Sequence, residues 1–343
     1  MSKNYKTKKQ EKKKKKLALI ILLFIFTFIV LSSATYAWFS SNKNGLIESI
    51  DINVATVTGL QISENAIDWK NDITKDELVA AKGTYLSALN QFPDTLSAVS
   101  TDGTVANGRM NMFYGVTNEE KDGSYTLVTS QETEINCYGD EQCAGHHYIA
   151  FDIFLLTTNP TDLVVTANSS VINRDEKDRG IDTGGQNSAR IGFVTMGTIP
   201  DTSGPYAAQA LNSGTSSVIW EPNYDVHTDG GIAQAARFYG YSVSKSGSPR
   251  LPYRGVNRAF STPVLLTETK NSPYFTSMNP QITTTKVFSD EQYLTHIGAG
   301  ITKMRIYMWL EGEDVDYENN AADGKLTFNL EIAMPHGITP QQP

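Results

Sequence analysis

The chain of 343 residues lacks the short motifs that mark the common enzyme classes. It contains no HExxH pair of a zinc protease, no GxSxG turn of a serine hydrolase and no glycine-rich phosphate loop ending in Lys-Ser or Lys-Thr. The Gly184-Gly185 pair lies in a polar stretch after no convincing strand, so we interpret it as a turn. These absences favour a protein without catalytic activity.

Positive charge is scarce beyond the first sixteen residues. Those residues hold nine lysines and one acid, Glu11, out of 29 Lys and Arg and 37 Asp and Glu in the chain. The remainder therefore has 20 basic against 36 acidic residues, a net charge of −16. Because phosphate contacts need clustered Lys or Arg, we expect no nucleic-acid partner.

The lysine-rich start precedes a stretch without charge from Leu17 to Leu31, followed by small and polar residues. This is the layout of an export signal. Extended to Phe39, the stretch reaches about the 20 residues that a bilayer needs. We therefore predict a cytoplasmic segment 1–16, a signal peptide or membrane anchor 17–37, and an exported domain 38–343. A cleaved signal would be cut between Ala37 and Trp38.

Cysteine is rare: Cys137 and Cys143 are the two cysteines of the chain. In an exported protein, such a close pair favours one small disulfide loop over two free thiols. His146 and His147 follow nearby, but their spacing fits no closed tetrahedral zinc site. Because the closed loop is short, the disulfide should stabilise the domain only modestly.

The exported part has the patterns of an all-β protein. Ile50, Ile52 and Val54 alternate with polar residues and predict a half-buried strand, and the apolar run 148–156 predicts a central strand. Residues 163–167 should pair with that run as a hairpin. Residues 304–310 and 326–332 alternate strictly, which predicts a sheet with one buried and one wet face.

Helical signals are few. Thr74 and Glu77 form a potential capping box before a short apolar face, and residues 232–241 predict a second short helix. We therefore predict a jelly-roll-like β-sandwich with one or two short helices and loop-rich insertions in a long middle region, 65–288.

Two acidic stretches are candidates for chemistry. The loop 311–320 brings together five acids, Glu311, Glu313, Asp314, Asp316 and Glu318. The last four could hold calcium, although a solvated loop is the simpler interpretation. In the second stretch, 221–227, Glu221, Asp225 and His227 are separated by even numbers of residues, so their side chains would lie on the same face of a strand. We favour a hydrogen-bonded corner over a metal site there. His146 and His147 would point to opposite faces of a strand, so only one could face a given site.

Several segments resemble one family. The junction ATYAWFSSN (34–42), the early strand within 50–62, the closing strand 326–332 and the phrase MRIYMWLEGEDVDY (304–317) are similar to exported proteins of the TasA/camelysin type. These are biofilm-matrix fibre proteins processed by a SipW-type signal peptidase. The resemblance implies a jelly-roll subunit that polymerises with copies of itself by donor-strand complementation. By position, the donor segment is 38–54, with Ile50, Ile52 and Val54 as its strand.

The chain departs from that family in its long middle region and in its cysteine pair. Camelysin-type members are described as metallopeptidases, but this chain has no zinc-protease motif, so we do not expect that activity here. We expect a non-enzymatic structural subunit of a cell-surface or matrix fibre, without a cofactor unless the acidic loop holds calcium. The alternative is a membrane-anchored surface protein that binds a partner or glycan. A metal-dependent hydrolase built on His146 and His147, or on Asp225 and His227, comes last.

Overall fold

The computed structural model describes Lys16 and residues 51–56, 59–93, 95–137, 143, 145–173, 184–251, 253–278, 282–283, 292–317 and 326–335. The chain divides into two compact units, residues 1–36 and 37–343, and all the described strands belong to the second. The predicted signal or anchor, the cleavage site at Ala37 and Trp38, the donor residue Ile50 and the loop acid Glu318 lie outside the described residues. In the part of the chain that is described, no helix is long and apolar enough to span a membrane.

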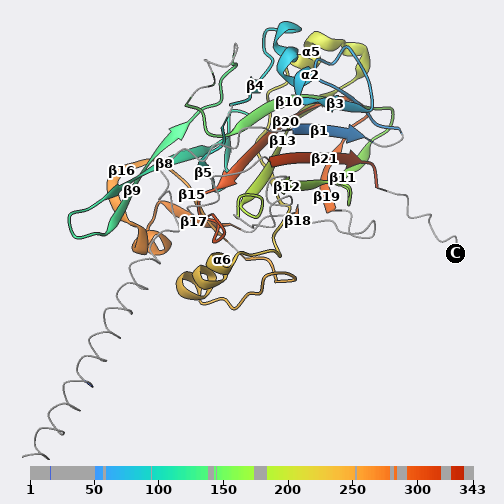
Figure 1. Ribbon diagram of the computed structural model, residues 1–343. Helices are drawn as coiled ribbons and strands as arrows, with labels where there is room; N and C mark the ends of the chain where they lie inside the picture. Colours follow the sequence, from blue (N-terminus) through green and yellow to red (C-terminus); the bar gives the residue numbers. More distant parts are fainter. Residues whose placement is uncertain are drawn as a thin grey trace, which may run out of the picture. The chain divides into compact units, whose positions relative to one another are not determined.

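The second unit is built mostly from strands, which confirms the all-β prediction (Figure 1). Its smaller sheet has the order β19 (Gln292–Ile297), β11 (Thr161–Val165), β21 (Leu326–Ala333), β1 (Asp51–Thr56) and β3 (Asp72–Thr74), and β12 (Ser170–Asn173) also pairs with β21.

The larger sheet has the order β16 (Phe260–Leu265), β9 (Tyr125–Glu132), β8 (Met112–Glu119), β5 (Ala98–Ser100), β20 (Gly300–Glu311), β13 (Ala189–Ile199), β14 (Val218–Glu221) and β18 (Ile282–Thr283). In the same sheet, β10 (Ile149–Thr157) pairs with β20, and β2 (Gln61–Ser63) and β4 (Asn90–Gln91) pair with β10. Two small ribbons pair β15 (Tyr253–Val256) with β17 (Phe275–Met278) and β6 (Val105–Ala106) with β7 (Arg109–Met110).

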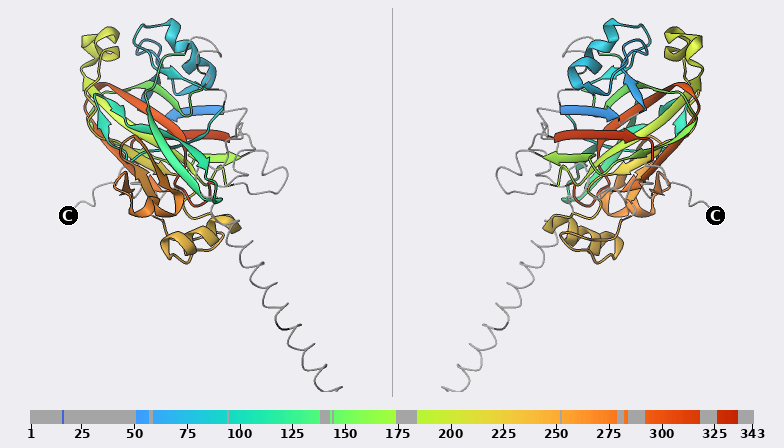
Figure 2. Two further views of the ribbon diagram at one scale, coloured as in Figure 1. Left: turned by 90° about the vertical axis from the view of Figure 1, so that its left-hand side faces the viewer. Right: turned by 90° about the vertical axis from the view of Figure 1, so that its right-hand side faces the viewer.

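Short helices lie outside the sheets. The α-helices among the described residues of the second unit include α2 (Lys75–Ala80), α5 (Pro205–Gln209) and α6 (Asp229–Gln234). The 3-10 turns are η1 (Ala81–Gly83), η2 (Asp201–Ser203) and η4 (Leu266–Asn271), and η3 (Ala235–Tyr239) is a π-helical turn. Figure 2 shows α2 and α5 toward one end of the sheets and α6 toward the other.

The main core consists of alternating residues from both sheets. It includes Phe151 and Leu155 of β10, Ile306 of β20, and Phe328 and Leu330 of β21, all almost completely buried. Each such side chain contributes about 1.5–3 kcal/mol on burial. The period-2 patterns of 304–310 and 326–332 therefore predicted which residues of β20 and β21 face this core.

Three sequence predictions about strand partners and exposure were wrong. β10 and β11 do not form a hairpin, because β11 pairs with β19 and β21 in the other sheet. Likewise β20 and β21, although consecutive among the described strands, belong to different sheets. β20 also has no wet face, since Tyr307 and Trp309 pack in a second core on its far side. An alternating pattern specifies the buried face of a strand but not the strand beside it.

Other local predictions were confirmed. Glu77 Oε2 accepts hydrogen bonds from the backbone N–H and the hydroxyl of Thr74, at 2.8 and 2.9 Å, and so caps α2. α6 and η3 cover much of the second predicted helix, and Cys137 and Cys143 form a disulfide. The long middle region supplies β10, β13 and β14, so it contributes central strands of the larger sheet rather than loops alone.

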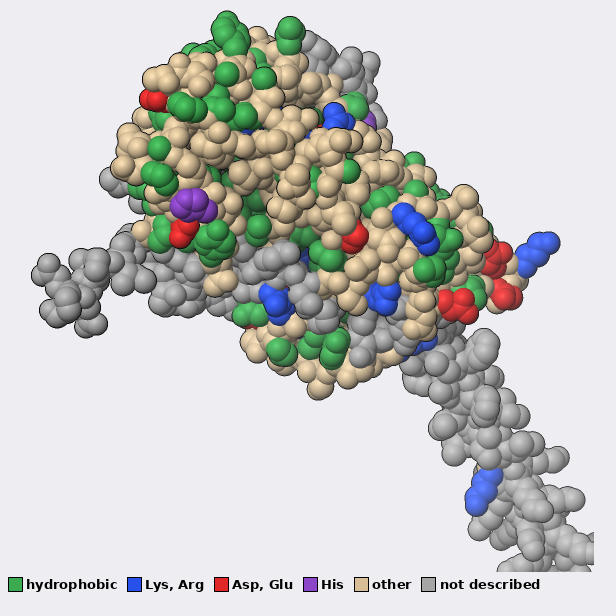
Figure 3. All heavy atoms as spheres, turned by 180° about the vertical axis from the view of Figure 1, so that it is seen from behind, with side chains coloured by type: hydrophobic (Ala, Val, Ile, Leu, Met, Phe, Trp, Pro, Cys, Tyr) green, Lys and Arg blue, Asp and Glu red, His purple; other side chains and the backbone are tan. Residues whose placement is uncertain are grey.

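The surface carries few large apolar side chains. Leu86 and Tyr206 are the most exposed of those described, at 99% and 83%. Figure 3 shows hydrophobic side chains protruding at the end of the molecule that carries α2 and α5, while Lys and Arg side chains are scattered on that face. The described part of this face therefore presents no basic patch for nucleic acid.

Candidate functional site

The predicted donor strand is β1, and in this single chain it completes its own smaller sheet. It runs parallel to β21 over six register pairs, from Asp51 beside Thr327 to Thr56 beside Ile332. On its other side it runs antiparallel to β3 over three pairs, from Asn53 beside Thr74 to Ala55 beside Asp72. β1 thus fills a slot between two strands that lie later in the chain.

The slot needs a strand in it. Without β1, both β21 and β3 would present a row of unpaired N–H and C=O groups. The apolar residues beside it, Phe328, Leu330 and Ile73, are at most 1% exposed and belong to the main core. An empty slot would therefore open the core as well as the sheet.

The structure brings the two acidic stretches of the sequence together at the end of β20. We call this group the acid cluster: Glu221, Glu311, Glu313, Asp314 and Asp316, with Arg190 and His227. Arg190, 1% exposed on β13, donates from Nη2 to Glu221 at 2.6 Å and to Asp314. Its Nη1 donates to the carbonyl oxygens of residues 187 and 189 at 3.1 and 3.0 Å.

The second half of the cluster centres on Asp316. His227 Nδ1 lies 2.6 Å from Asp316 Oδ2, and the backbone N–H of Thr228 donates to Oδ1 at 2.7 Å. Two glycines crowd Asp316: a Cβ on Gly231 would come within 2.0 Å of Oδ1, and one on Gly184 within 2.0 Å of the Asp316 carbonyl oxygen. Gly184, with φ +79, is thus the turn residue predicted, and it also makes room for the acidic loop.

Two of the predicted calcium ligands take part in these contacts. The described part of the acidic loop is buried rather than solvated, since Glu313, Asp314 and Asp316 are at most 7% exposed. Asp314 is bound by Arg190 and Asp316 by His227, while Glu313 Oε1 is buried without a hydrogen-bond partner among the described residues. No three His, Cys, Asp or Glu side chains in the described ranges gather as metal ligands. His227, from the stretch 221–227, reaches Asp316 of the other acidic stretch.

Burial dominates the electrostatics of the cluster. Desolvation, with the nearby Asp314 carboxylate, raises the pKa of Glu221 to about 7 against the opposing effect of Arg190. Desolvation raises the pKa of Glu311 to about 7 and that of Asp316 to about 6, and it moves the pKa of Glu313 well above its usual range. Burial opposes the charge of His227, but the hydrogen bond to Asp316 and nearby carboxylates outweigh it and raise its pKa. The cluster therefore holds protons near neutral pH.

A second buried network lies on strands β10 and β20. Asp152, 2% exposed, accepts from Arg305 Nε at 2.8 Å and Nη2 at 3.1 Å, and lies 3.1 Å from Lys303 Nζ. Arg305 continues to Glu134, which accepts from the hydroxyl of Tyr307 at 3.0 Å. No sequence pattern indicates this network, because Glu134 and Asp152 lie far along the chain from the β20 residues that they bind.

We expect Asp152→Ala to lower the free energy of unfolding by about 3–5 kcal/mol, because it leaves the buried Lys303 without its carboxylate and the buried Arg305 with the Glu134 carboxylate alone. Guanidinium denaturation of the exported chain, followed by tryptophan fluorescence, would measure this loss. The matched control is Asp162→Ala, which breaks an exposed pair with His296 and should cost no more than about 1 kcal/mol. Equal effects of the two substitutions would contradict a structural role of the buried network.

His146 and His147 do share a partner, contrary to the sequence prediction. Their Nδ1 atoms lie 2.9 and 2.5 Å from the two carboxylate oxygens of Glu132, at the end of β9. The pair precedes β10 rather than lying within it, so strand alternation does not apply. His147 also stacks on Tyr114, with 4.6 Å between ring centroids. Glu132 fixes both rings close to Cys143, whose carbonyl oxygen accepts from the backbone N–H of His146 at 3.1 Å.

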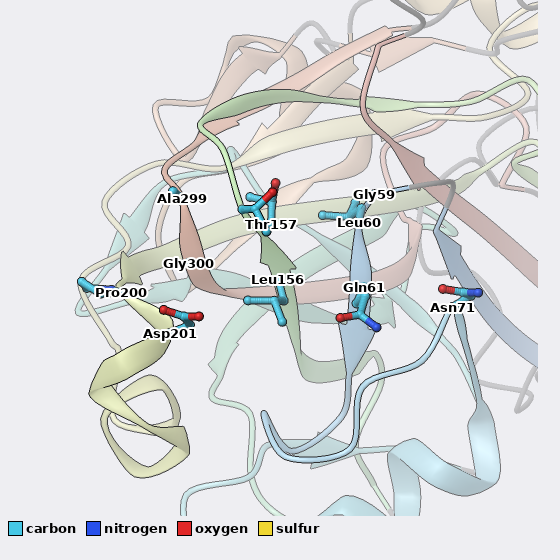
Figure 4. A pocket seen from close by; sticks show the side chains of 11 residues that line it. Gly59, Leu60, Gln61, Asn71, Leu156, Thr157, Pro200, Asp201, Ala299 and Gly300 are labelled. Atoms are coloured by element: carbon cyan, nitrogen blue, oxygen red, sulfur yellow. The ribbon is translucent and has the colours of Figure 1, made fainter.

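An open cleft of about 1120 Å³ lies where the chain passes between the two sheets. It is lined by Gly59, Leu60, Gln61, Asn71, Leu156, Thr157, Thr158, Pro200, Asp201, Ala299 and Gly300 (Figure 4). Sequence reasoning missed this cleft because its lining comes from separate places in the chain, between residue 59 and residue 300. Its size suits a small-molecule or oligomeric ligand.

No family model, curated protein or solved structure matches this chain. The resemblance to TasA/camelysin-type proteins therefore stays a prediction. The strand slot, the cleft and the buried clusters are the features of the molecule that bear on its function.

Proposed function

We propose that this protein is an exported, non-enzymatic structural subunit of a cell-surface or matrix fibre, a jelly-roll-like sandwich that assembles by exchanging β1. The observation that carries the proposal is the position of β1 in the slot between β21 and β3. A strand that precedes the whole domain in sequence, and that fills a slot made by later strands, can be supplied equally well by a neighbouring copy.

Exchange would keep the same interactions. A neighbour's β1 would make the same register pairs with β21 and β3, so little free energy is lost when one strand replaces the other. If each subunit gives its strand to the next, the contact is head-to-tail, and it generates an open filament when the rotation between subunits does not close a ring. Removal of the predicted signal at Ala37 would free the segment ahead of β1 for this movement.

The connection to β2 limits the geometry of the filament. β1 ends at Thr56 and β2 begins at Gln61, so four residues join them. Four residues span at most about 14 Å. Gly59, with φ +92, lies in this connection and would allow it to change direction. Neighbouring subunits would therefore be held close together.

We expect deletion of residues 38–54 to abolish filaments in the exported protein, as seen by negative-stain electron microscopy and sedimentation. The N-terminal residue and intact mass of the secreted chain should be measured first, because a chain that begins at Trp38 has a free donor segment. Val54→Pro, which removes one backbone donor from β1, should weaken assembly, whereas Val54→Ile should not. Filaments formed by the deletion variant would refute strand donation.

The second candidate function is a membrane-anchored surface protein that binds a ligand. The open cleft between the sheets favours it. Such a protein would stay monomeric, keep its lysine-rich start and fractionate with membranes, which the same mass measurement would reveal.

A further inference from the structure

The cleft is formed where the chain crosses between the sheets. Three crossings contribute to its lining: residues 59–60 between β1 and β2, 158 between β10 and β11, and 299 between β19 and β20. Gly300, at the start of β20, would bring a Cβ within 2.1 Å of the Ile199 carbonyl oxygen, so a side chain cannot occupy that wall. Loops at the end of a sandwich are a common place for binding sites.

The floor of the cleft is an apolar platform with polar side chains on both sides. Leu156 pairs with Gln61 on one side and with Ile301 on the other, and directly paired residues share a face of the sheet. Figure 4 shows Asp201 and Gln61 on either side of Leu156. Leu156 is half-buried, whereas Gln61 and Asp201 are exposed.

The polar groups on the platform are available to a ligand. No described residue binds the side chains of Gln61 and Asp201, in contrast to the Thr157 hydroxyl, which donates to the Asn159 carbonyl oxygen at 3.0 Å. The carboxylate accepts hydrogen bonds, and the amide both donates and accepts them. Free hydrogen-bonding groups beside an apolar surface suit a ligand that has hydroxyl groups on its rim and C–H groups on its face.

The charges of the residues that line the cleft exclude further classes of ligand. Among the described residues, no Lys or Arg lines the cleft, and Asp201 is its one charged residue. A phosphate or sulfate group would find no cation in this lining, and an extended peptide would find no free strand edge along Leu156, because β2 and β20 occupy both sides of β10. A neutral sugar ring meets both conditions.

We propose that the cleft binds a neutral saccharide, whose ring packs on Leu156 while its hydroxyl groups bond to Asp201 and Gln61. This inference deepens the second candidate function by naming a ligand class, and it is compatible with fibre assembly. A fibre subunit with this cleft would bind matrix or cell-wall saccharides along its length.

Saturation-transfer NMR on the exported chain would test the proposal. The probes are neutral tetrasaccharides of glucose, galactose, mannose and N-acetylglucosamine, with a sulfated heparin tetrasaccharide for comparison. We expect transfer to at least one neutral probe and none to the sulfated one. Asp201→Ala should weaken binding of that probe about tenfold, the value of a hydrogen bond to a charged group. Leu156→Asp should remove binding altogether.

The matched control is Asp229→Ala, which removes an exposed carboxylate from α6 and should leave saccharide binding unchanged. The proposal is overturned if no neutral probe shows transfer, if only the sulfated probe binds, or if binding survives both cleft substitutions. Filament assembly is measured separately, so a chain that forms filaments but binds no saccharide would contradict this inference alone.

Discussion

A chain carrying Asn53→Cys and Asn329→Cys should run as a covalent ladder on a non-reducing gel once it has formed filaments. The two positions face each other across the parallel pair of β1 and β21. If β1 comes from the neighbouring subunit, the new disulfide joins two chains, and successive exchanges join many. The same chain kept monomeric should close the disulfide within itself and run as a single band.

A second cysteine pair controls for accidental cross-linking. Asp162 faces His296 across β11 and β19, both exposed and both later in the chain than the donor segment. Asp162→Cys with His296→Cys should therefore give an internal disulfide and a single band even in filaments. If the Asn53 and Asn329 variant also gives a single band in verified filaments, strand exchange is wrong and another surface must hold the subunits together.

The positions of the strands in the sequence, and the side chains that face the core, were easier to predict than the pairing of the strands in the sheets. Ile153 and Leu155, and Phe328 and Leu330, face the core because alternation along a strand fixes the side on which each residue lies. Their sheet partners depend on crossings such as that from β10 to β11, which are encoded in packing between distant residues. The sequence pattern cannot distinguish a tight hairpin from a short crossing to the opposite sheet.

The candidate sites show the same limit. The sequence pointed to His227 and to the acids 313–316 separately, but Arg190 joins one half of the cluster and lies far from both in the chain. Nothing in the sequence around Arg190, at the start of β13, signals that this arginine is buried. Similarly, Glu132 is the residue that aligns His146 and His147, and it precedes them by more than a dozen positions. Such sites become visible only when the topology is known.

The acid cluster should make the folded protein less stable as the pH rises from about 5.5 to about 8. Glu221 and Glu311 hold their protons more tightly in the folded chain, with pKa values of about 7, than in the unfolded chain, where the usual value is 4.5. Their stabilising contribution is therefore complete below pH 4.5 and is lost as the pH rises through 7. His227, whose pKa is also raised, changes stability in the same direction. Either glutamate should contribute roughly 2 kcal/mol to the decrease over this interval.

Glu221→Gln tests this dependence because the amide resembles the protonated carboxyl: its oxygen can still accept from Arg190, and its nitrogen takes the place of the unpaired Oε2. The decrease in the free energy of unfolding between about pH 5.5 and about pH 8 should shrink by roughly 2 kcal/mol in urea titrations. Glu77→Gln is the control, since the hydrogen bond from Lys70 lowers the pKa of Glu77 to about 2 and its stabilising effect is lost only in acid. An unchanged pH dependence in Glu221→Gln would mean that this carboxyl is ionised in the folded chain, and that Arg190 compensates it fully despite the burial of both groups.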